Sequence, residues 1–300
     1  MKGTDPEPAV QRGTEFIMGS EETGLKEAAR VVAEADALLI GAGAGMGVDS
    51  GLPDFRGNQG FWKAYPPYQK LGLNFVALAN PRWFRADPTL AWGFYGHRLH
   101  LYRATQPHEG FQILRRWGEQ ITHGAFVYTS NVDGHFQKAG FDPERVMEVH
   151  GSLDYFQCLG ECGADLFASD GISIDIDETT MRAREPLPSC PGCDGPARPN
   201  VLLFGDGEWD PRRGYEQELR FNRWLGSLGG ARLAIVECGA GMAIPTVRHL
   251  CEHVARRFPH ARLIRINVRE PDVPVGGIEL AMGALDALRE INARIGEPGA

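Results

Sequence analysis

The sequence of 300 residues lacks any apolar run that approaches the roughly 18 residues of a membrane-spanning helix. Its N-terminus lacks the apolar core of a secretory signal. It also lacks an excess of basic residues, because a formal net charge of −8 leaves no basic footprint for DNA or RNA. We therefore expect a cytoplasmic protein that binds neither membranes nor nucleic acid directly. An acidic surface favours lysine-rich protein substrates instead.

The glycine-rich stretch over residues 37–57, ALLIGAGAGMGVDSGLPDFRG, lacks the ordinary dinucleotide fingerprint. The G-x-G-x-x-G template fails in each register, because its last glycine falls in turn on Met46, Val48 and Ser50. No acid lies near position 61 to hold a ribose. The stretch looks like a nucleotide-binding turn that departs from the pattern of hydride-transferring enzymes.

Short apolar runs alternate along the chain with stretches long enough for helices. The hydrophobic content of 43% suffices for one large core, or for a main domain with a smaller module. The pattern predicts an α/β fold with a Rossmann-like, doubly wound parallel sheet, in which ligands gather at the carboxyl ends of the strands. The runs that we expect to form strands are residues 37–40, 125–128, 146–149, 233–236 and 263–268.

Three stretches fall outside this alternation. Residues 1–22 show no apolar period and are predicted to be a flexible leader or an added, non-native tail. Residues 58–105 are rich in aromatic side chains, which predicts a helical insertion that roofs a cleft. Residues 155–197 carry four of the six cysteines. Within a catalytic unit over residues 23–295, the large Rossmann-like part is then expected to comprise residues 23–57, 106–154 and 198–295.

The four cysteines form two close pairs, C-L-G-E-C and C-P-G-C. They are Cys158, Cys162, Cys190 and Cys193. Two such pairs separated by a loop can supply four thiolates to one tetrahedral Zn²⁺, a closed site that organises the module without taking part in chemistry. Disulfides are the alternative, which a cytoplasmic chain disfavours. A redox C-x-x-C motif needs only one of the two pairs.

Polar residues follow two of the predicted strands. Asn131 and Asp133 come after the run at 125–128, and His150 comes after the run at 146–149. An amide, a carboxylate and a histidine at neighbouring strand ends can converge as binding groups and a general base. Taken singly, Asn-x-Asp-Gly is a common turn and a lone histidine is more often structural.

Taken together and in order, these motifs closely resemble those of the sirtuins. The resemblance covers residues from about 24 to 294. Its motifs are Gly43-Ala44-Gly45, Gly51-Leu52-Pro53-Asp54-Phe55-Arg56-Gly57, Asn131-Val132-Asp133-Gly134, His150-Gly151-Ser152, the cysteine pairs, Arg198-Pro199-Asn200-Val201 and Phe204-Gly205-Asp206. It implies an enzyme that consumes NAD to remove acyl groups from lysine side chains of a protein or peptide. It also implies a small domain made of a zinc module and a helical module.

The resemblance assigns roles to single positions. The glycines let backbone N–H groups approach the pyrophosphate, and Arg56 adds a positive charge nearby. Phe55 shields the reacting ribose carbon from water. The residues expected to bind NAD are Gly43, Ala44, Gly45, Asp54, Phe55, Arg56, Ser130, Asn131, Val132, Asp133, Gly239, Ala240, Gly241 and Asn267. Phe204 and Gly205 are expected to contact the acyl-lysine substrate.

His150 and Asn131 are the expected catalytic residues. In sirtuins the acyl oxygen displaces nicotinamide from the ribose, and the histidine then accepts a proton from a ribose hydroxyl. The ordinary histidine pKa of about 6.5 suits a base near neutral pH. The products implied are free lysine, nicotinamide and O-acyl-ADP-ribose.

The sequence departs from the family at three cofactor contacts. Gly47 stands where a serine is usual, Ser130 replaces a glutamine, and Ala240 replaces a threonine. Two alternatives therefore stay open: an ADP-ribosyltransferase or NAD glycohydrolase on the same scaffold, and a catalytically silent NAD sensor. The acyl group, the target protein and the oligomeric state are not determined by the sequence.

A further clue concerns the acyl group. Tyr95 and Arg98, in W-G-F-Y-G-H-R, are three residues apart and share one face of a predicted helix. Desuccinylating and demalonylating sirtuins carry a similar Tyr-x-x-Arg. The alternative is that Tyr95 packs in the core while Arg98 pairs with a surface acid.

Overall fold

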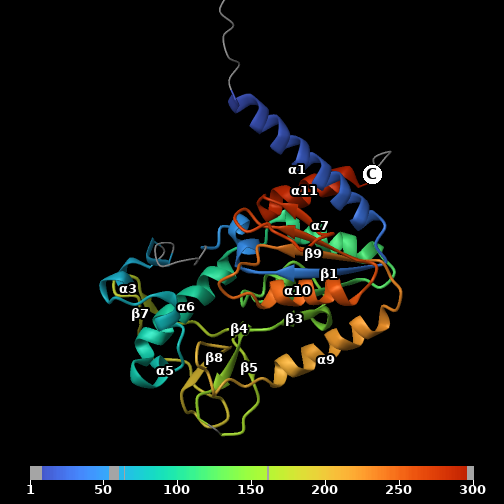
Figure 1. The fold of residues 1–300 in the computed structure, drawn as a ribbon. Coiled ribbons are helices and arrows are strands. Elements are labelled where there is room, and N and C mark those ends of the chain that lie inside the picture. Colours follow the sequence, from blue (N-terminus) through green and yellow to red (C-terminus); the bar gives the residue numbers. More distant parts are fainter. Residues whose placement is uncertain (1–8, 54–60, 64, 161, 296–300) are drawn as a thin grey trace, which may run out of the picture.

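A six-stranded parallel sheet forms the centre of the molecule (Figure 1). The structure is a computed structural model that describes residues 9–53, 61–63, 65–160 and 162–295. The strand order is β11-β10-β9-β1-β2-β3. The bounds are β1 Ala37–Ala42, β2 Ala125–Thr129, β3 Val146–Glu148, β9 Leu233–Cys238, β10 Ala261–Ile266 and β11 Ile278–Leu280. The predicted doubly wound α/β fold is confirmed, and β11 is an additional strand.

Side chains of the central strand alternate between two covered faces, as the period of a strand requires. Leu38 and Ile40 join the core beneath α1 (Ala9–Ala33), α7 (Glu109–Gln120) and α11 (Ala284–Arg294). Leu39 joins the opposite core, against α9 (Arg212–Ser227) and α10 (Thr246–Arg257). Figure 1 shows these two helical layers on either side of the sheet.

Helix α1 begins at Ala9, well inside the stretch that was predicted as a flexible leader. No proline follows Pro8 until Pro53, so no residue in this stretch removes a helical N–H. From Leu25 onward the helix buries apolar side chains against α11 and β11. The structure therefore replaces much of the expected leader with helix.

A second, three-stranded antiparallel sheet carries the cysteine pairs. Its order is β5-β4-β8, with β4 Gly151–Cys158, β5 Phe167–Ala168 and β8 Ala197–Val201. A short hairpin of β6 (Ile176–Asp177) and β7 (Arg182–Ala183) follows β5 in the chain. The boundaries proposed at 154 and 198 fall inside β4 and β8, so the division of the chain into parts stays a prediction.

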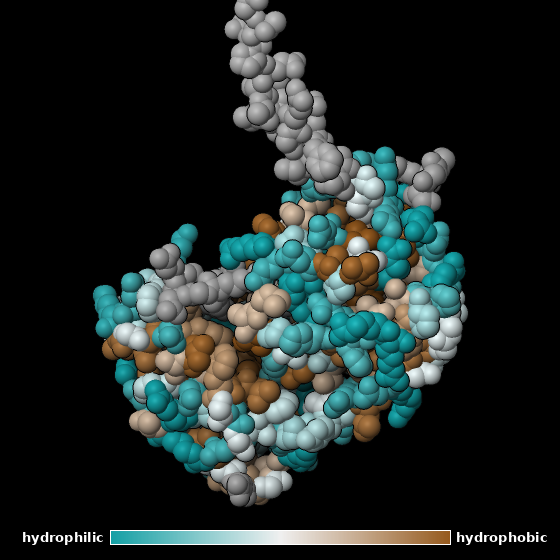
Figure 2. All heavy atoms as spheres, viewed as in Figure 1, coloured by the Kyte–Doolittle hydropathy of each residue, from teal (hydrophilic) through white to brown (hydrophobic). Residues whose placement is uncertain are grey.

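The described portion of the aromatic-rich insertion includes the helices α3 Pro66–Lys70, α4 Phe75–Leu78, α5 Trp83–Ala86 and α6 Pro88–Ala104. Helix α6 lies directly on the β6–β7 hairpin, because a Cβ at Gly93 would stand 2.1 Å from the Met181 carbonyl oxygen. The Tyr68 hydroxyl donates to the same oxygen at 2.9 Å. Figure 2 shows hydrophobic residues gathered over this insertion, where Leu71 and Val76 are exposed.

The segments after β1 and β9 cross in direct backbone contact. A Cβ at Gly43 would stand 2.6 Å from the Cα of Ala240, and one at Gly239 would stand 2.4 Å from the Cα of Gly45. Gly239 also has a φ of +63°. Only glycine fits both positions, so the crossing itself requires these residues.

Replacing Gly239 with Ala is expected to lower the free energy of unfolding by at least about 3 kcal/mol, because backbone strain and backbone overlap add. The matched control is Gly229→Ala, at a φ of +54° with nothing within 4 Å of the added Cβ. This control carries the backbone strain of a positive φ without any overlap, so its free energy of unfolding should fall by about 1 kcal/mol. Urea unfolding measures the free energy of unfolding of both variants. Equal losses would show that backbone overlap at the crossing adds nothing to the strain.

Candidate active site

The glycines of the first turn hold the turn together. The N–H of Gly43 donates to the Cys238 carbonyl and the N–H of Gly45 donates to the Gly239 carbonyl, each at 3.0 Å. Within residues 43–45, Gly43 is buried, Gly45 is half-buried and Ala44 is exposed. Two of the backbone donors expected to face the pyrophosphate are therefore engaged with the β9 segment. Contact between residues 43–45 and a cofactor stays a prediction.

Asn131 links the ends of β1 and β2. Its side-chain Nδ2 donates to the Gly43 carbonyl at 3.0 Å, and its backbone N–H donates to the Thr129 hydroxyl at 3.0 Å. The N–H of Ser130 donates to the Ala42 carbonyl at 3.1 Å. The amide predicted to be catalytic is thus fixed beside the glycine turn.

Asp133 and a second carboxylate flank the turn that follows Asn131. The N–H of His135 donates to Asp133 Oδ1 at 3.0 Å. A Cβ at Gly134 would stand 2.3 Å from Oδ2 of Asp154, a half-buried residue of β4. Burial, reinforced by the nearby Glu148, raises the pKa of Asp154 to about 6. Sequence reasoning missed this acid, because nothing in its local pattern shows that β4 runs beneath the turn.

His150 lies between the two sheets. The N–H of Val149 donates to the Thr129 carbonyl at 2.9 Å, and the His150 carbonyl accepts from the N–H of Leu202 at 3.0 Å. The imidazole is half-buried. Desolvation lowers its pKa, against the opposing effect of the Ser130 backbone. A histidine in this setting is neutral at neutral pH and can accept a proton.

The segments expected to hold the adenosine half lie after β9 and β10. Gly239 and Ala240 are buried, and Gly241 is half-buried. The Asn267 side chain donates from Nδ2 to the Ala240 carbonyl at 2.8 Å. Its Oδ1 accepts from the N–H groups of Arg269 and Glu270. Asn267 therefore joins the two segments, and the ribose contact expected from the sequence stays a prediction.

Gly47 packs against Leu52. A Cβ at this position would stand 2.9 Å from the Cδ1 of Leu52, so a serine requires the end of that side chain to shift. The neighbouring polar residues make structural contacts. Asp49 accepts from the N–H of Leu285 at 2.9 Å, and the Ser50 hydroxyl accepts from the N–H of His108 at 3.0 Å. Both support α11 and α7.

The expected substrate segment is organised by a buried ion pair. Arg198 donates to Asp206 at 3.0 Å, and both side chains are fully buried. The backbone N–H of Phe204 donates to the Ala79 carbonyl at 3.0 Å, which fixes the segment to the helical insertion. Gly205 is exposed, with a φ of +69°. Phe204 and Gly205 thus stand on a rigid turn.

Tyr95 and Arg98 both lie on the buried face of α6. The Tyr95 ring packs near Phe84 and Phe94, and burial raises the pKa of its hydroxyl to about 12. Within the described chain, that hydroxyl has no hydrogen-bond partner. Arg98 donates to the Tyr102 hydroxyl at 2.6 Å. The predicted shared face is present, whereas the contact with an acyl group is untested. Asp54, Phe55 and Arg56 lie outside the described residues.

The four cysteines of the two pairs converge. Their sulfur atoms all lie within 4.8 Å of one another, with 3.7 Å between Cys158 and Cys193 and between Cys162 and Cys190. A tetrahedral zinc with Zn–S bonds of about 2.3 Å requires sulfur–sulfur edges of about 3.8 Å. All six thiols of the chain are free. The cluster therefore fits one structural Zn²⁺ and does not fit disulfides.

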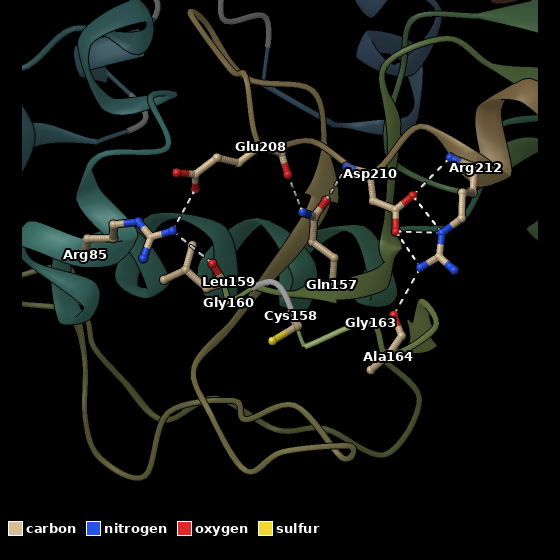
Figure 3. Close-up of a pocket in the computed structure, with 10 residues that line it drawn as sticks. All are labelled: Arg85, Gln157, Cys158, Leu159, Gly160, Gly163, Ala164, Glu208, Asp210 and Arg212. Atoms are coloured by element: carbon tan, nitrogen blue, oxygen red, sulfur yellow. Dashed lines mark hydrogen bonds and ion pairs between the residues drawn. The ribbon is translucent and has the colours of Figure 1, made fainter.

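A polar pocket of about 310 Å³ borders the first cysteine pair (Figure 3). Arg85 reaches it from the helical insertion and pairs with Glu208 at 3.1 Å. On the other side, Arg212 pairs with Asp210 at 2.6 Å and donates to the Ala164 carbonyl at 3.0 Å. Figure 3 shows that the two ion pairs lie on either side of Gln157. The charged groups of the pocket neutralise one another, and they tie the segment before α9 to the cysteine module.

Together these features define an α/β protein with a candidate nucleotide site at the carboxyl edge of its parallel sheet and a zinc-type cluster in the module of the second sheet. The donor set fits a dinucleotide: an exposed glycine-turn residue, an amide and a carboxylate are groups that bind phosphate, carboxamide and ribose. In the described portion of the chain, no helix has the length and apolar character to cross a bilayer.

The model of the Sir2 family matches residues 43–217. An NAD-dependent protein deacylase of Aeropyrum pernix is 33% identical over 180 residues, which are 60% of this chain and 64% of that protein. One of Aquifex aeolicus is 34% identical over 164 residues, 55% and 59% of the two chains. The chain thus matches less than two thirds of these relatives' length.

Solved structures extend the similarity. A Sir2 homologue mutant with ADP-ribose is 25% identical, with a TM-score of 0.67 over 90% of this chain and 95% of that one. A Sir2 homologue in complex with NAD is also 25% identical, with a TM-score of 0.63 over 90% and 93%. The chain belongs to the Sir2, or sirtuin, family.

Replacing Cys190 with Ser is expected to abolish binding of the one zinc equivalent, because the cluster then lacks a thiolate. The control is Cys251→Ser, since Cys251 is equally buried but lies in α10, on the side that faces the core. Metal analysis of both purified proteins checks the expectation. A folded Cys190→Ser protein with a full equivalent of zinc would refute the four-cysteine site.

Proposed function

We propose that the protein is an NAD-dependent protein-lysine deacylase that releases nicotinamide and O-acyl-ADP-ribose. The observation that carries the proposal is the placement of His150 against the backbone of Ser130, next to the Asn131 that is bound to the glycine turn. The printed names of the relatives, which are NAD-dependent protein deacylases, support it. NAD, when bound, supplies the ribose carbon from which nicotinamide leaves and the hydroxyl that receives the acyl group.

The residues of the chain then have distinct tasks. Neutral His150 accepts the proton of the ribose hydroxyl. Asn131 and Asp133, with the backbone of Ser130 and Val132, orient the nicotinamide half. Residues 43–45, 239–241 and Asn267 line the remainder of the cofactor. Asp54, Phe55 and Arg56 remain expected contacts. The substrate, an acyl-lysine protein or peptide, passes the turn at Phe204 and Gly205.

Zinc holds the small sheet together at a distance from the reaction. A closed four-thiolate site has no open position for a water or a substrate, so its metal is structural. Reduced thiols persist in the cytoplasm, and a cytoplasmic location remains part of the proposal.

Purified protein incubated with NAD and acetyl-, crotonyl- or succinyl-lysine peptides is expected to form O-acyl-ADP-ribose only when a peptide is present. Mass spectrometry identifies the products, and the panel also tests whether Tyr95 and Arg98 favour an acidic acyl group. His150→Ala, the control, should lose product formation by at least about 100-fold, the usual scale of acid–base catalysis.

Two other outcomes have defined meanings. Nicotinamide release that is equal with and without peptide would indicate an NAD glycohydrolase. ADP-ribose attached to protein would indicate a transferase. Either result would overturn the deacylase proposal.

The pH dependence follows from the burial of His150. Its pKa is lowered, so the neutral imidazole persists below the ordinary value of about 6.5. We expect kcat/KM for the acyl peptide to stay constant as the pH falls through 6.5 and to decline only below it. Circular dichroism at each pH controls for unfolding. An acidic limb centred above about 6.5 would contradict the assignment of the base.

A further inference from the structure

The strand that leads to His150 ends in a buried carboxylate. Glu148, the last residue of β3, is 1% exposed. β3 is the edge strand of the large sheet, with β2 on one side and α9 on the other. A buried carboxylate is costly unless it is paired and hydrogen-bonded, so the partners of Glu148 determine where the end of β3 lies.

Both partners come from the first turns of α9. Arg213 donates from Nη2 to Glu148 Oε2 in a close ion pair. The buried Gln217 contacts Glu148 at two points: its Oε1 accepts the backbone N–H at 3.0 Å, and its Nε2 lies 3.4 Å from the same Oε2. Gln217 therefore satisfies the N–H that an edge strand leaves open. Together the two side chains fix the backbone and the carboxylate of Glu148.

Arg213 also contacts the strand that follows His150. Its guanidinium carbon lies 4.3 Å from the centroid of the Tyr155 ring, in β4. A planar guanidinium can bind a carboxylate and stack on an aromatic face at the same time. One side chain of α9 thus holds residues on both sides of His150 in the sequence.

The start of α9 is itself fixed. Arg212, the first residue of the helix, pairs with Asp210 and reaches the Ala164 carbonyl of the cysteine module (Figure 3). Gln157 donates to the Glu208 carbonyl at 2.8 Å. The first turn of α9 is therefore a rigid support between the cysteine module and the His150 segment.

We propose that Arg213 and Gln217 are positioning residues that hold His150, through Glu148 and Tyr155, where its imidazole accepts the proton. The inference rests on the proposed deacylase function. Displacement of nicotinamide precedes the step in which His150 acts. A shift of His150 by a fraction of an ångström therefore slows formation of O-acyl-ADP-ribose and leaves the earlier, reversible displacement intact.

Two rates separate these steps. One is formation of O-acyl-ADP-ribose, and the other is acyl-peptide-dependent exchange of labelled nicotinamide into NAD. For Arg213→Gln we expect the first rate to fall by at least about tenfold and the second to stay within about twofold. His150→Ala provides the reference for a protein that retains exchange and loses product formation.

Arg220→Gln is the matched control. Arg220 lies on the same helix and pairs with Glu144, at the opposite end of β3 from His150, at 3.2 Å. The same change there removes an ion pair between α9 and the segment before β3, and it does not reach His150. Both of its rates should stay within about twofold of the wild-type values, because Glu144 is largely exposed.

The inference would be overturned if Arg213→Gln lowered both rates in proportion, or if it lowered neither, as is expected of Arg220→Gln. If Arg213→Gln fails to fold, the double variant Glu148→Gln with Arg213→Gln replaces it, because it leaves no unpaired charge buried. The same difference between the two rates is expected for it. A wild-type protein that forms no O-acyl-ADP-ribose would overturn the proposed function and this inference together. If the wild-type protein forms O-acyl-ADP-ribose but Arg213→Gln lowers both rates equally, only the inference is overturned.

Discussion

The close backbone crossing of the segments after β1 and β9 is the constraint on which the site depends. Because neither Gly43 nor Gly239 carries a Cβ, the two segments approach to backbone contact, and the N–H groups of Gly43 and Gly45 donate hydrogen bonds to carbonyls of the second segment. Two side-chain amides then bind to the crossing from opposite sides, Asn131 at the Gly43 carbonyl and Asn267 at the Ala240 carbonyl. Both halves of the predicted cofactor site are therefore built on one rigid junction, and binding needs little rearrangement there.

The sheet and the cysteine cluster were predictable because each depends on local sequence. The run LAIV at 233–236 lies within β9, where every residue is buried, as a strand covered on both faces should be. The cysteine pairs carry their ligand spacing in the sequence itself. β11 was missed, since Ile278, Glu279 and Leu280 provide only three residues of alternation. The start of α1 was missed because its first turns show no apolar period.

Roles that depend on distant partners were not predictable. Glu148 sits inside the run VMEV, which looks like an ordinary buried strand, and its partner Arg213 lies 65 residues away. Asn267 and the N–H groups of Gly43 and Gly45 make contacts within the protein that the sequence did not indicate, and their contact with a cofactor stays a prediction. Sequence motifs name the candidate residues of a site, whereas the contacts of those residues are set by the whole fold.

The packing of Gly47 against Leu52 couples the glycine turn to the helical insertion. A serine at position 47 brings its Cβ to 2.9 Å from Leu52, a residue of the core formed with the helical insertion. The hydroxyl usual in the family therefore requires the end of the Leu52 side chain to shift, and a change in the glycine turn is in this way transmitted to that core.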